Sequence, residues 1–329
     1  MFKIWSERGI PADLMADLQG FAEEIGPAGK TPDNPHVEIP GAHAIVAGGS
    51  KYPAEVMDKA PDLLIIARLG AGFENVDIPA ATERKIAVTN APDAPTISTA
   101  EHALALILAT AKNLKTAERR IKTETIRDFY KDHNALELYE SRLGLIGLGR
   151  IGSRVAKLCQ ARGMKVATSD PYGSGEAAGE LNVEVRGSVT ELVPDAEVVS
   201  IHAPLDENSR HIINAETLGY FKKGAILVNA ARGGLVDETA LPAALDSGQI
   251  GAAGLDVTDP EPPPADHPLL AYPNVIITPH VGSGSVAGKY RIGTHSIQRA
   301  VCALRGERPP NLLNPEVWPD VKARIKEIA

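Results

Sequence analysis

Three side chains suited to anion binding and proton transfer, Arg232, Glu261 and His280, each stand shortly after a β-rich run of apolar residues. A guanidinium can hold a carboxylate with two parallel donors, and an imidazole beside a carboxylate can exchange a proton near neutral pH. If the three runs are strands of one open parallel sheet, their carboxyl ends share the edge where such sheets bind ligands. The sequence therefore predicts a single site that contains all three residues.

Each of the three residues also has a purely structural interpretation. Arg232 lies beside glycines, and an arginine in that setting is commonly a solvated turn residue. His280 follows a proline and can be a capping or packing group, while Glu261 lies in the proline-rich run 260–264 and can be plain surface. Their common placement after predicted strands, rather than any one residue, favours the functional interpretation.

A glycine-rich turn near the middle of the chain predicts a dinucleotide site. The apolar run 143–146 precedes Gly147, Gly149 and Gly152, and a helix is predicted over 150–162. The first glycine permits a tight turn, the second lets the backbone approach a pyrophosphate, and the third lets the helix pack close to the sheet. The N-terminus of that helix then offers free N–H groups and a positive dipole end to the phosphates.

An acidic residue selects the kind of dinucleotide. Asp170 follows a second strand-like run, 164–169, and lies roughly 20 residues beyond the glycine turn. Its carboxylate can accept hydrogen bonds from both hydroxyls of a ribose and would repel a 2′-phosphate. The predicted cofactor is therefore NAD rather than NADP.

Composition restricts the class of protein. The chain has 329 residues and a net charge of −8, and a typical domain size of about 150 residues suggests two domains. The acidic balance argues against a nucleic-acid partner, which needs clustered Lys and Arg. Cys159 and Cys302 are the only cysteines, so neither a disulfide framework nor a cysteine-based metal site is expected, and no other metal cluster is suggested.

The sequence also predicts where the protein resides. Residues 1–5 enter a strand-like run without the charged and apolar regions of a signal peptide. The longest apolar stretch, 103–111, is far shorter than the ~20 residues that a membrane span requires. A cytoplasmic protein without a membrane partner is expected.

Short β-rich runs alternate with helical stretches, which is typical of parallel sheets with crossover helices. The candidate strands are 2–6, 43–47, 63–69, 86–89, 143–146, 164–169, 198–202, 225–229, 254–257 and 275–278. Because the glycine turn lies well inside the chain, a separate α/β unit must precede it. The expected fold is α/β, with two Rossmann-like or flavodoxin-like parallel-sheet domains: a cofactor domain, 100–285, inserted into a substrate domain made of 1–99 and 286–329.

A long helix is predicted over 98–114. It is apolar almost all round, so we expect it to be buried on more than one side and to meet a second subunit in a homodimer. The charged stretch 118–141 shows no clear hydrophobic periodicity and is interpreted as an irregular segment at the surface.

The residues resemble those of a known family, the D-isomer-specific 2-hydroxyacid dehydrogenases. The resemblance covers residues 63–282 and rests on motifs in the family's order: RLGAGFENVD at 68–77, TAEH at 99–102, GLGRIG at 147–152 with Asp170, NAARG at 229–233 with Val236 and Asp237, GLDV at 254–257 ahead of Glu261, and TPH at 278–280. It implies an NAD-dependent enzyme that transfers a hydride between nicotinamide and a small D-2-hydroxy acid or its 2-keto partner.

The resemblance also implies a role for each site residue. Arg232 would hold the substrate carboxylate and polarise the keto oxygen, and His280 would protonate that oxygen in reduction and take the proton back in oxidation. Glu261 would orient the imidazole and stabilise its charged form. Backbone N–H groups of Ala71 and Gly72 would hold the carboxylate from the other domain. The implied cofactor contacts are Thr99, Gly147, Gly149, Arg150, Ile151, Gly152, Asp170, His202, Pro204, Ala230, Asp256 and Gly282, with Asp256 near the carboxamide and His202 on the adenine side.

The remaining histidines are weaker candidates. His102 lies inside the predicted apolar helix and is interpreted as a packing residue. No partner can be argued for His267 or His295 from the sequence.

The chain departs from the family's common pattern before the glycine turn. The family usually has a tryptophan and a glycine there, whereas this chain has IRDFY at 126–130 and NALEL at 134–138. Because that segment can reach a neighbouring subunit's substrate site in relatives, the identity of the keto acid stays open. The chain also ends soon after its second passage through the predicted substrate domain, so no appended regulatory domain is expected.

Two alternatives use the same scaffold. One is a phosphite- or formate-type dehydrogenase, although the formate branch has glutamine at the position of Glu261. The other is an NAD-sensing interaction protein similar to the family's transcriptional corepressors, which would bind the cofactor without turning over keto acids.

Overall fold

The computed structural model describes residues 1–26, 31, 34–123, 130–173 and 175–328. The chain divides into two compact units, unit 1 (Met1–Pro95 with Val286–Ala329) and unit 2 (Thr96–Ser285). The first division falls before residue 96 rather than residue 100, because Thr96 already begins a helix of unit 2. Of the divergent segment noted above, 126–129 lie outside the described residues.

Unit 1 is built on a five-stranded sheet in the order β2-β1-β3-β4-β5, and every neighbouring pair is parallel. The strands are β1 (Phe2–Ser6), β2 (Ala22–Ile25), β3 (Ala44–Ala47), β4 (Ile65–Arg68) and β5 (Ala87–Thr89). The helices are α1 (Ala12–Asp17), α2 (Ala54–Met57), α3 (Ile78–Glu83), α11 (Val286–Leu304), η4 (Pro315–Val317) and α12 (Trp318–Ile328).

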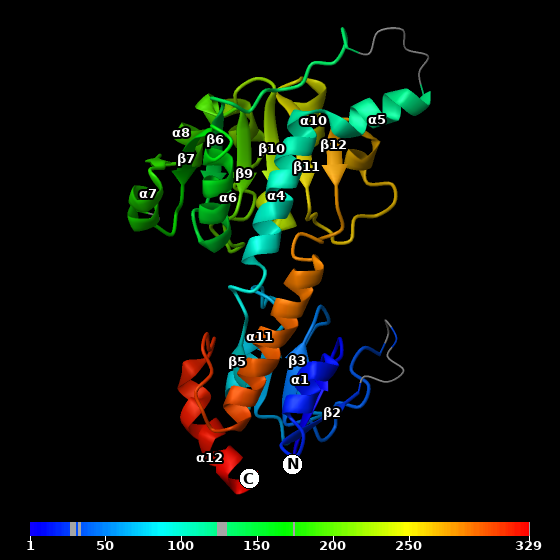
Figure 1. Cartoon of the computed structure of the whole chain (residues 1–329), viewed down its shortest axis with the longest axis vertical. Coiled ribbons are helices and arrows are strands. Elements are labelled where there is room, and N and C mark those ends of the chain that lie inside the picture. Colours follow the sequence, from blue (N-terminus) through cyan, green and yellow to red (C-terminus); the bar gives the residue numbers. More distant parts are fainter. Residues whose placement is uncertain (27–30, 32–33, 124–129, 174, 329) are drawn as a thin grey trace. The chain divides into compact units, whose positions relative to one another are not determined.

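Two apolar cores cover the two faces of this sheet. Ile297 and Ala300 of α11 and Val321 of α12 belong to one core, while Met57 of α2 and Ala81 of α3 belong to the other. Figure 1 shows α11 in front of the sheet of unit 1. Helices on both faces explain why the central strands are apolar throughout rather than alternating.

Unit 2 contains a seven-stranded, wholly parallel sheet in the order β12-β11-β10-β9-β6-β7-β8. Its strands are β6 (Arg142–Ile146), β7 (Lys165–Ser169), β8 (Glu184–Val185), β9 (Val198–Ile201), β10 (Ala225–Asn229), β11 (Ile250–Leu255) and β12 (Val275–Ile277). Its helices are α4 (Thr96–Ala111), α5 (Leu114–Thr123), α6 (Arg150–Gln160), α7 (Gly175–Leu181), α8 (Val189–Leu192), η1 (Val193–Asp195), α9 (Ala215–Tyr220), η2 (Gly233–Leu235), α10 (Leu241–Asp246) and η3 (Pro268–Ala271).

Helices cover both faces of this second sheet as well. Ile107 of α4 and Val155 of α6 share one core, and Leu192, Leu218 and Leu241 of α8, α9 and α10 share the other. Figure 1 shows α4 and α6 in front of the sheet. The strand order reverses beside β6, whose neighbours are β7 and β9, and ligands of doubly wound sheets bind at that reversal.

Several predicted elements differ from those observed. The long helix ends at Ala111, because Asn113 adopts a left-handed backbone (φ 49°), and α5 then occupies the start of the stretch interpreted as irregular. The strand predicted over 254–257 begins at Ile250 and ends at Leu255. The start of β11 was not recognised because it contains Gly251, and glycine is not typical of strands. Glycine is needed at this position, since a Cβ there would lie 2.5 Å from the Gly224 oxygen. The strands β2 and β8 were not predicted.

Candidate active site

The three predicted catalytic residues follow three adjacent strands of unit 2. Arg232 follows β10, Glu261 follows β11 and His280 follows β12, and these strands are parallel neighbours. Their carboxyl ends therefore lie at one edge of the sheet. The topology thus places the three residues as the sequence analysis required.

Glu261 and His280 are in direct contact. The His280 Nδ1 atom lies 2.5 Å from the Glu261 Oε1 atom, within hydrogen-bonding distance. Both side chains remain accessible, with exposed fractions of 44% for His280 and 40% for Glu261. The pair therefore leaves Nε2 of the imidazole available to a substrate while the carboxylate fixes the ring's orientation.

The backbone at His280 is held in an unusual conformation. Its φ is +50°, in the left-handed region that non-glycine residues seldom occupy. The His280 N–H donates to the Asp256 carbonyl at 2.7 Å, which ties the residue to the end of β11. A left-handed histidine held by the neighbouring strand end is typical of functional positions that the surrounding structure over-determines.

The loop of Arg232 is fixed by its own neighbours. The Asn229 side chain accepts from the Ala231 N–H (3.1 Å) and donates to the Arg232 carbonyl (2.8 Å). Gly233 packs so closely against the segment after β11 that a Cβ there would lie 2.1 Å from the Thr258 oxygen. The loops that carry Arg232 and Glu261 are therefore in backbone contact.

Asp256 forms a buried hub at the end of β11. Its carboxylate accepts from the Val281 N–H (2.9 Å), the Gly282 N–H (2.8 Å) and the Thr278 hydroxyl (2.6 Å), and it lies 3.2 Å from His102 Nε2. Burial opposes its ionisation, but the bonds from His102, Thr278 and the two amides outweigh burial and hold the pKa of Asp256 below its ordinary value.

This hub adds to what the sequence indicated for two residues, and the cofactor contact of Asp256 stays a prediction. His102, interpreted from the sequence as packing, is bonded to Thr278 (3.1 Å) and contacts Asp256. Asp256, expected near the nicotinamide carboxamide, fixes the turn after β12 that carries His280. A Cβ at Gly282 would lie 2.8 Å from the Asp256 carboxylate and 3.6 Å from Thr99, so Thr99 and Gly282 lie in the same cluster.

The glycine turn between β6 and α6 has the geometry expected of a pyrophosphate site. Gly147 has φ +93°, and a Cβ at Gly152 would lie 2.2 Å from the Gly147 oxygen. Gly149 is the N-cap of α6, receives no side-chain cap, and faces open space where a Cβ would be. An uncapped helix N-terminus beside open space fits the phosphates of a dinucleotide, with Arg150 and Ile151 in the first turn.

Asp170 is bound to the same turn. One carboxylate oxygen accepts from the Leu148 N–H (2.8 Å) and the other from the Tyr172 N–H (2.9 Å). The acid is thereby anchored at the end of β7, beside the glycine turn, as a ribose-binding acid must be.

His202 and the residues near it line the same edge. His202 Nε2 lies 2.9 Å from the Ser200 hydroxyl, and burial lowers the pKa of His202 to about 4. Burial therefore disfavours the charged ring, and His202 is not suited to act as a general acid. Pro204 and Ala230 follow β9 and β10.

The loop of unit 1 that was predicted to bind the substrate carboxylate is held by hydrogen bonds from side chains of the same unit. Asn90 donates to the Ala71 carbonyl at 2.6 Å, and Arg68 donates to Asn75 at 3.0 Å. Asn75 in turn donates to the Ser50 carbonyl at 2.6 Å. Ala71 and Gly72 thus lie on a loop whose backbone is held by side chains, and their contact with substrate stays a prediction.

A buried pair was missed by sequence reasoning. Glu238 Oε2 and His267 Nε2 lie 2.9 Å apart, with exposed fractions of 7% and 9%. No local pattern marks either residue, because the two belong to separate segments of the chain.

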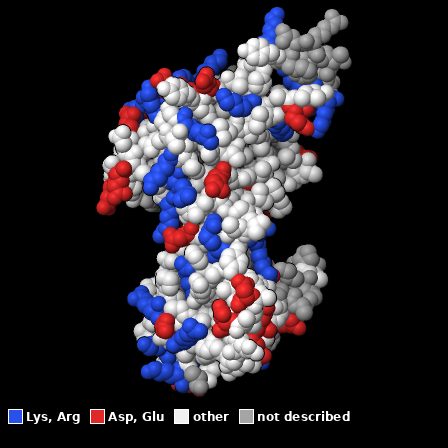
Figure 2. Space-filling model, viewed as in Figure 1, with Lys and Arg blue, Asp and Glu red and all other residues white. Residues whose placement is uncertain are grey.

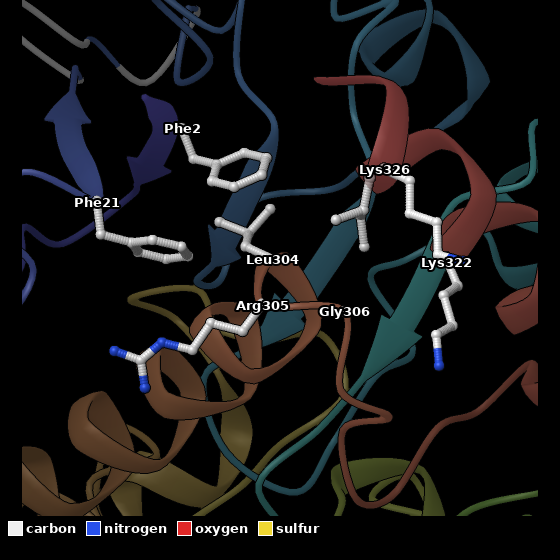
Figure 3. A pocket seen from close by; sticks show the side chains of 8 residues that line it. Phe2, Phe21, Leu304, Arg305, Gly306, Lys322 and Lys326 are labelled. Carbon is white, nitrogen blue, oxygen red and sulfur yellow. The ribbon is translucent and has the colours of Figure 1, made fainter. Parts of the chain in front are cut away.

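A hollow in unit 1 lies apart from these residues. It has a volume of about 410 Å³ and is lined by Phe2, Phe21, Leu304, Arg305, Gly306, Lys322, Ile325 and Lys326 (Figure 3). It contains none of the predicted site residues.

Figure 2 shows acidic and basic side chains interspersed on the drawn face of unit 2. Within the described residues, no helix combines the length and apolarity of a membrane span, and no group of three or more potential metal ligands occurs.

A doubly wound parallel sheet, with an uncapped glycine turn at its reversal and an acid after the next strand, defines unit 2 as a dinucleotide-binding α/β domain. The family model for "D-isomer specific 2-hydroxyacid dehydrogenase, NAD binding domain" matches residues 104–282. The chain belongs to the D-isomer-specific 2-hydroxyacid dehydrogenase family, and unit 2 contains its NAD-binding domain.

Individual relatives agree with this assignment. The chain is 40% identical over 324 residues to D-3-phosphoglycerate dehydrogenase of Methanocaldococcus jannaschii, covering 98% of this chain and 61% of that protein. It is 39% identical to glyoxylate reductase of Korarchaeum cryptofilum, covering 80% of each. The structure of Aquifex aeolicus D-lactate dehydrogenase with NAD and lactic acid aligns with a TM-score of 0.78 and 29% identity, over 95% of this chain and 99% of that one. The chain thus spans less than two thirds of the phosphoglycerate dehydrogenase.

Proposed function

We propose that the protein is an NAD-dependent dehydrogenase that interconverts a small D-2-hydroxy acid and its 2-keto acid in the cytoplasm. The observation that carries the proposal is the His280–Glu261 pair, 2.5 Å apart. It lies at the strand edge that also bears Arg232, in the same unit as the glycine turn. The names of the relatives, which include a phosphoglycerate dehydrogenase and a glyoxylate reductase, support the substrate class.

The side chains divide the chemistry among them. Bound NADH supplies the hydride to the keto carbon. The Arg232 guanidinium, with its planar fork of donors, holds the substrate carboxylate and polarises the keto oxygen. His280 gives its proton to that oxygen, and Glu261 stabilises the imidazolium before the transfer and keeps the ring oriented.

The test of the proposal is a panel of 2-keto acids assayed with NADH. Glyoxylate, hydroxypyruvate, its phosphorylated form, pyruvate and bulkier keto acids cover the named relatives and their neighbours in size. We expect NADH-dependent reduction of at least one. Tight NADH binding without turnover of any would contradict the proposal and favour an NAD-sensing interaction protein, whereas oxidation of formate or phosphite would favour that alternative.

We predict that Asp170 sets the preference for NAD. The substitution Asp170→Asn retains an oxygen for the Leu148 N–H but removes the charge, so NADH binding should weaken by about 1.5–3 kcal/mol, the scale of a charged hydrogen bond. Binding of NADPH should improve at the same time, because repulsion of its 2′-phosphate is relieved. Fluorescence titration with both cofactors measures the change, and a wild-type preference for NADPH would refute the assignment.

We predict that Glu261→Gln changes the pH dependence of the reaction. Reduction requires protonated His280, which a neighbouring carboxylate favours, so removing the charge should move the alkaline limb of kcat/KM for reduction to lower pH. Oxidation requires neutral His280 and should gain activity on its acid side. Asp266→Asn, which removes an exposed charge from the same loop, is the control and should leave both profiles in place. Superimposable profiles for Glu261→Gln and wild type would remove Glu261 from the mechanism.

We propose a homodimer formed through α4. Leu104 and Leu108 are half-buried and Ala105 is exposed, and these positions share one face of the helix. An isologous two-fold contact would bury this face. Sedimentation velocity at micromolar concentration should show a dimer, and Leu108→Arg should shift it toward monomer. A wild-type monomer would contradict the proposal.

A further inference from the structure

A second His–carboxylate pair lies buried beneath the loop that carries Glu261. The Glu238 Oε2 and His267 Nε2 atoms are 2.9 Å apart. At this separation the two polar atoms are in contact. Neither Glu238 Oε2 nor the other ring nitrogen, Nδ1 of His267, has a well-aligned hydrogen-bond partner among the described residues. Two buried polar groups are thus held against each other, and each is the nearest polar contact that offsets the burial of the other.

The pair joins the two ends of the Glu261 loop. The Glu238 Oε1 atom accepts from the Asp259 N–H at 3.1 Å, two residues before Glu261. His267 lies at the far end of the loop, where its backbone N–H donates to the Pro264 carbonyl at 3.0 Å. One carboxylate thus contacts the start of the loop through one oxygen and its end through the other.

The same segment of chain also carries Arg232. Glu238 follows Arg232 by one short turn, η2 (Gly233–Leu235), and Gly233 is packed against the Thr258 oxygen. The segment 232–238 therefore contacts the Glu261 loop twice, once through the Gly233 backbone and once through the Glu238 side chain. Any displacement of Glu238 would be transmitted to Glu261 and from there to His280.

We propose that Glu238 and His267 are positioning residues, which hold the Glu261 loop so that its carboxylate meets the His280 imidazole. The proposal deepens the proposed dehydrogenase function and rests on it for the catalytic readout only. Neither residue is placed at the reacting atoms, and because both contact the loop that carries Glu261 we expect their effect to pass through Glu261.

Burial and neighbouring charges shift the pKa of the Glu238 carboxyl group. Burial, opposed by the bond from the Asp259 N–H and reinforced by the Asp259 charge, raises the pKa of Glu238 to about 7. The Asp259 carboxylate is itself paired with Arg210 at 3.2 Å, while Asp237 and His211 lie on the neighbouring segment. The carboxyl group of Glu238 is therefore easier to protonate than that of an exposed glutamate.

The test compares Glu238→Met with wild type. Methionine preserves the volume of glutamate but removes both contacts, and burial of an apolar group at this site is tolerated where an unpaired charge is not. We expect kcat/KM for keto-acid reduction to fall about 10- to 100-fold, with NADH affinity unchanged. The alkaline limb should move to lower pH, as in Glu261→Gln. Glu238→Gln retains an acceptor for the Asp259 N–H and should show a smaller shift in the same direction.

A readout independent of turnover separates this inference from the proposed function. The NMR signals of the His280 ring nitrogens, recorded at one pH in the protein without cofactor, should change in both Glu238 variants, because they report the contact of Nδ1 with Glu261. If wild type turns over no keto acid, the function fails but these signals still decide the inference. Ring signals identical to wild type in either folded variant would overturn the proposal, and Glu238→Gln suffices if Glu238→Met does not fold.

A double-mutant cycle tests the route of the effect. In the Glu261→Gln background, Glu238→Gln should move the alkaline limb no further, because the residue through which it acts is already neutral. An undiminished additional shift would show that Glu238 acts independently of Glu261 and would overturn the proposal. The control is Glu197→Gln, since Glu197 also accepts a backbone N–H (Arg142, 2.7 Å) and pairs with a lysine, but lies before β9 at the opposite edge of the sheet.

Discussion

The substitution His280→Asn should lower kcat for keto-acid reduction by about 10²- to 10⁴-fold, the range of effects of general acids, while NADH binding stays near that of wild type. Asparagine is chosen because His280 has φ +50°, and asparagine is among the few residues that tolerate the left-handed backbone. The loss should therefore report the missing proton donor rather than a disturbed turn. Steady-state kinetics and fluorescence titration of NADH measure the two quantities.

A matched control exists within the same unit. His211 is also a histidine with a left-handed backbone, φ +51°, and its N–H donates to the Gly234 carbonyl at 2.8 Å. His211→Asn makes the same chemical change in the same backbone conformation, without removing the ring bonded to Glu261. We expect near-wild-type kcat for this control. Equal losses in the two variants would show that the turn, and not the imidazole, accounts for the effect of His280→Asn.

The features that could be predicted from the sequence are those that a local segment dictates. The glycine turn is one, because a Cβ at Gly152 would collide with the Gly147 oxygen at 2.2 Å whatever the rest of the chain does. The strands that precede Arg232 and His280 are another, since β10 and β12 are short apolar runs whose positions were predicted, whereas only the end of β11 was found. Parallel order then brought Arg232, Glu261 and His280 to one edge without knowledge of any side-chain contact.

The elements that the sequence did not predict are two strands at the edges of the sheets and one strongly charged helix. The strand β2 (Ala22–Ile25) has two glutamates in the middle, and β8 (Glu184–Val185) is exposed at both residues. An edge strand has one neighbour and needs little apolar character, so hydrophobic periodicity does not reveal it. Likewise, α5 was hidden by its charges, although Lys115 anchors it by donating to the Val275 carbonyl at 2.6 Å.

The buried polar pairs could not be predicted because their partners are distant in sequence. His102 stands on α4 and its partner Asp256 follows β11, while Glu238 and His267 belong to separate loops. A histidine in an apolar helix is as compatible with packing as with hydrogen bonding until the facing residue is known. The strand order alone predicted where the catalytic side chains lie. The hydrogen bonds that support them could be identified only from the three-dimensional contacts.

Arg232→Lys should produce the second large effect, a fall in kcat/KM for keto acids with little change in NADH binding. Lysine keeps the positive charge but cannot make two parallel bonds to a carboxylate while also reaching the keto oxygen. Each charge-assisted hydrogen bond lost costs about 1.5–3 kcal/mol, which corresponds to roughly 10- to 100-fold in kcat/KM. The fall should appear in kcat as well as KM, because polarisation of the keto oxygen strengthens as negative charge develops on it.

More than one side chain holds the loop of Arg232. Asn229 bonds the backbone at both Ala231 and Arg232, and these bonds remain in Arg232→Lys, whereas the bond from the guanidinium to the Ala231 carbonyl at 2.7 Å is removed. Arg186→Lys is the control, because Arg186 lies beyond the short edge strand β8 and pairs with Glu184 and Asp195 on the surface. That control should retain wild-type kinetics. Near-normal kcat/KM for Arg232→Lys would show that simple charge suffices, and the carboxylate anchor would then have to be sought among the N–H donors of Ala71 and Gly72.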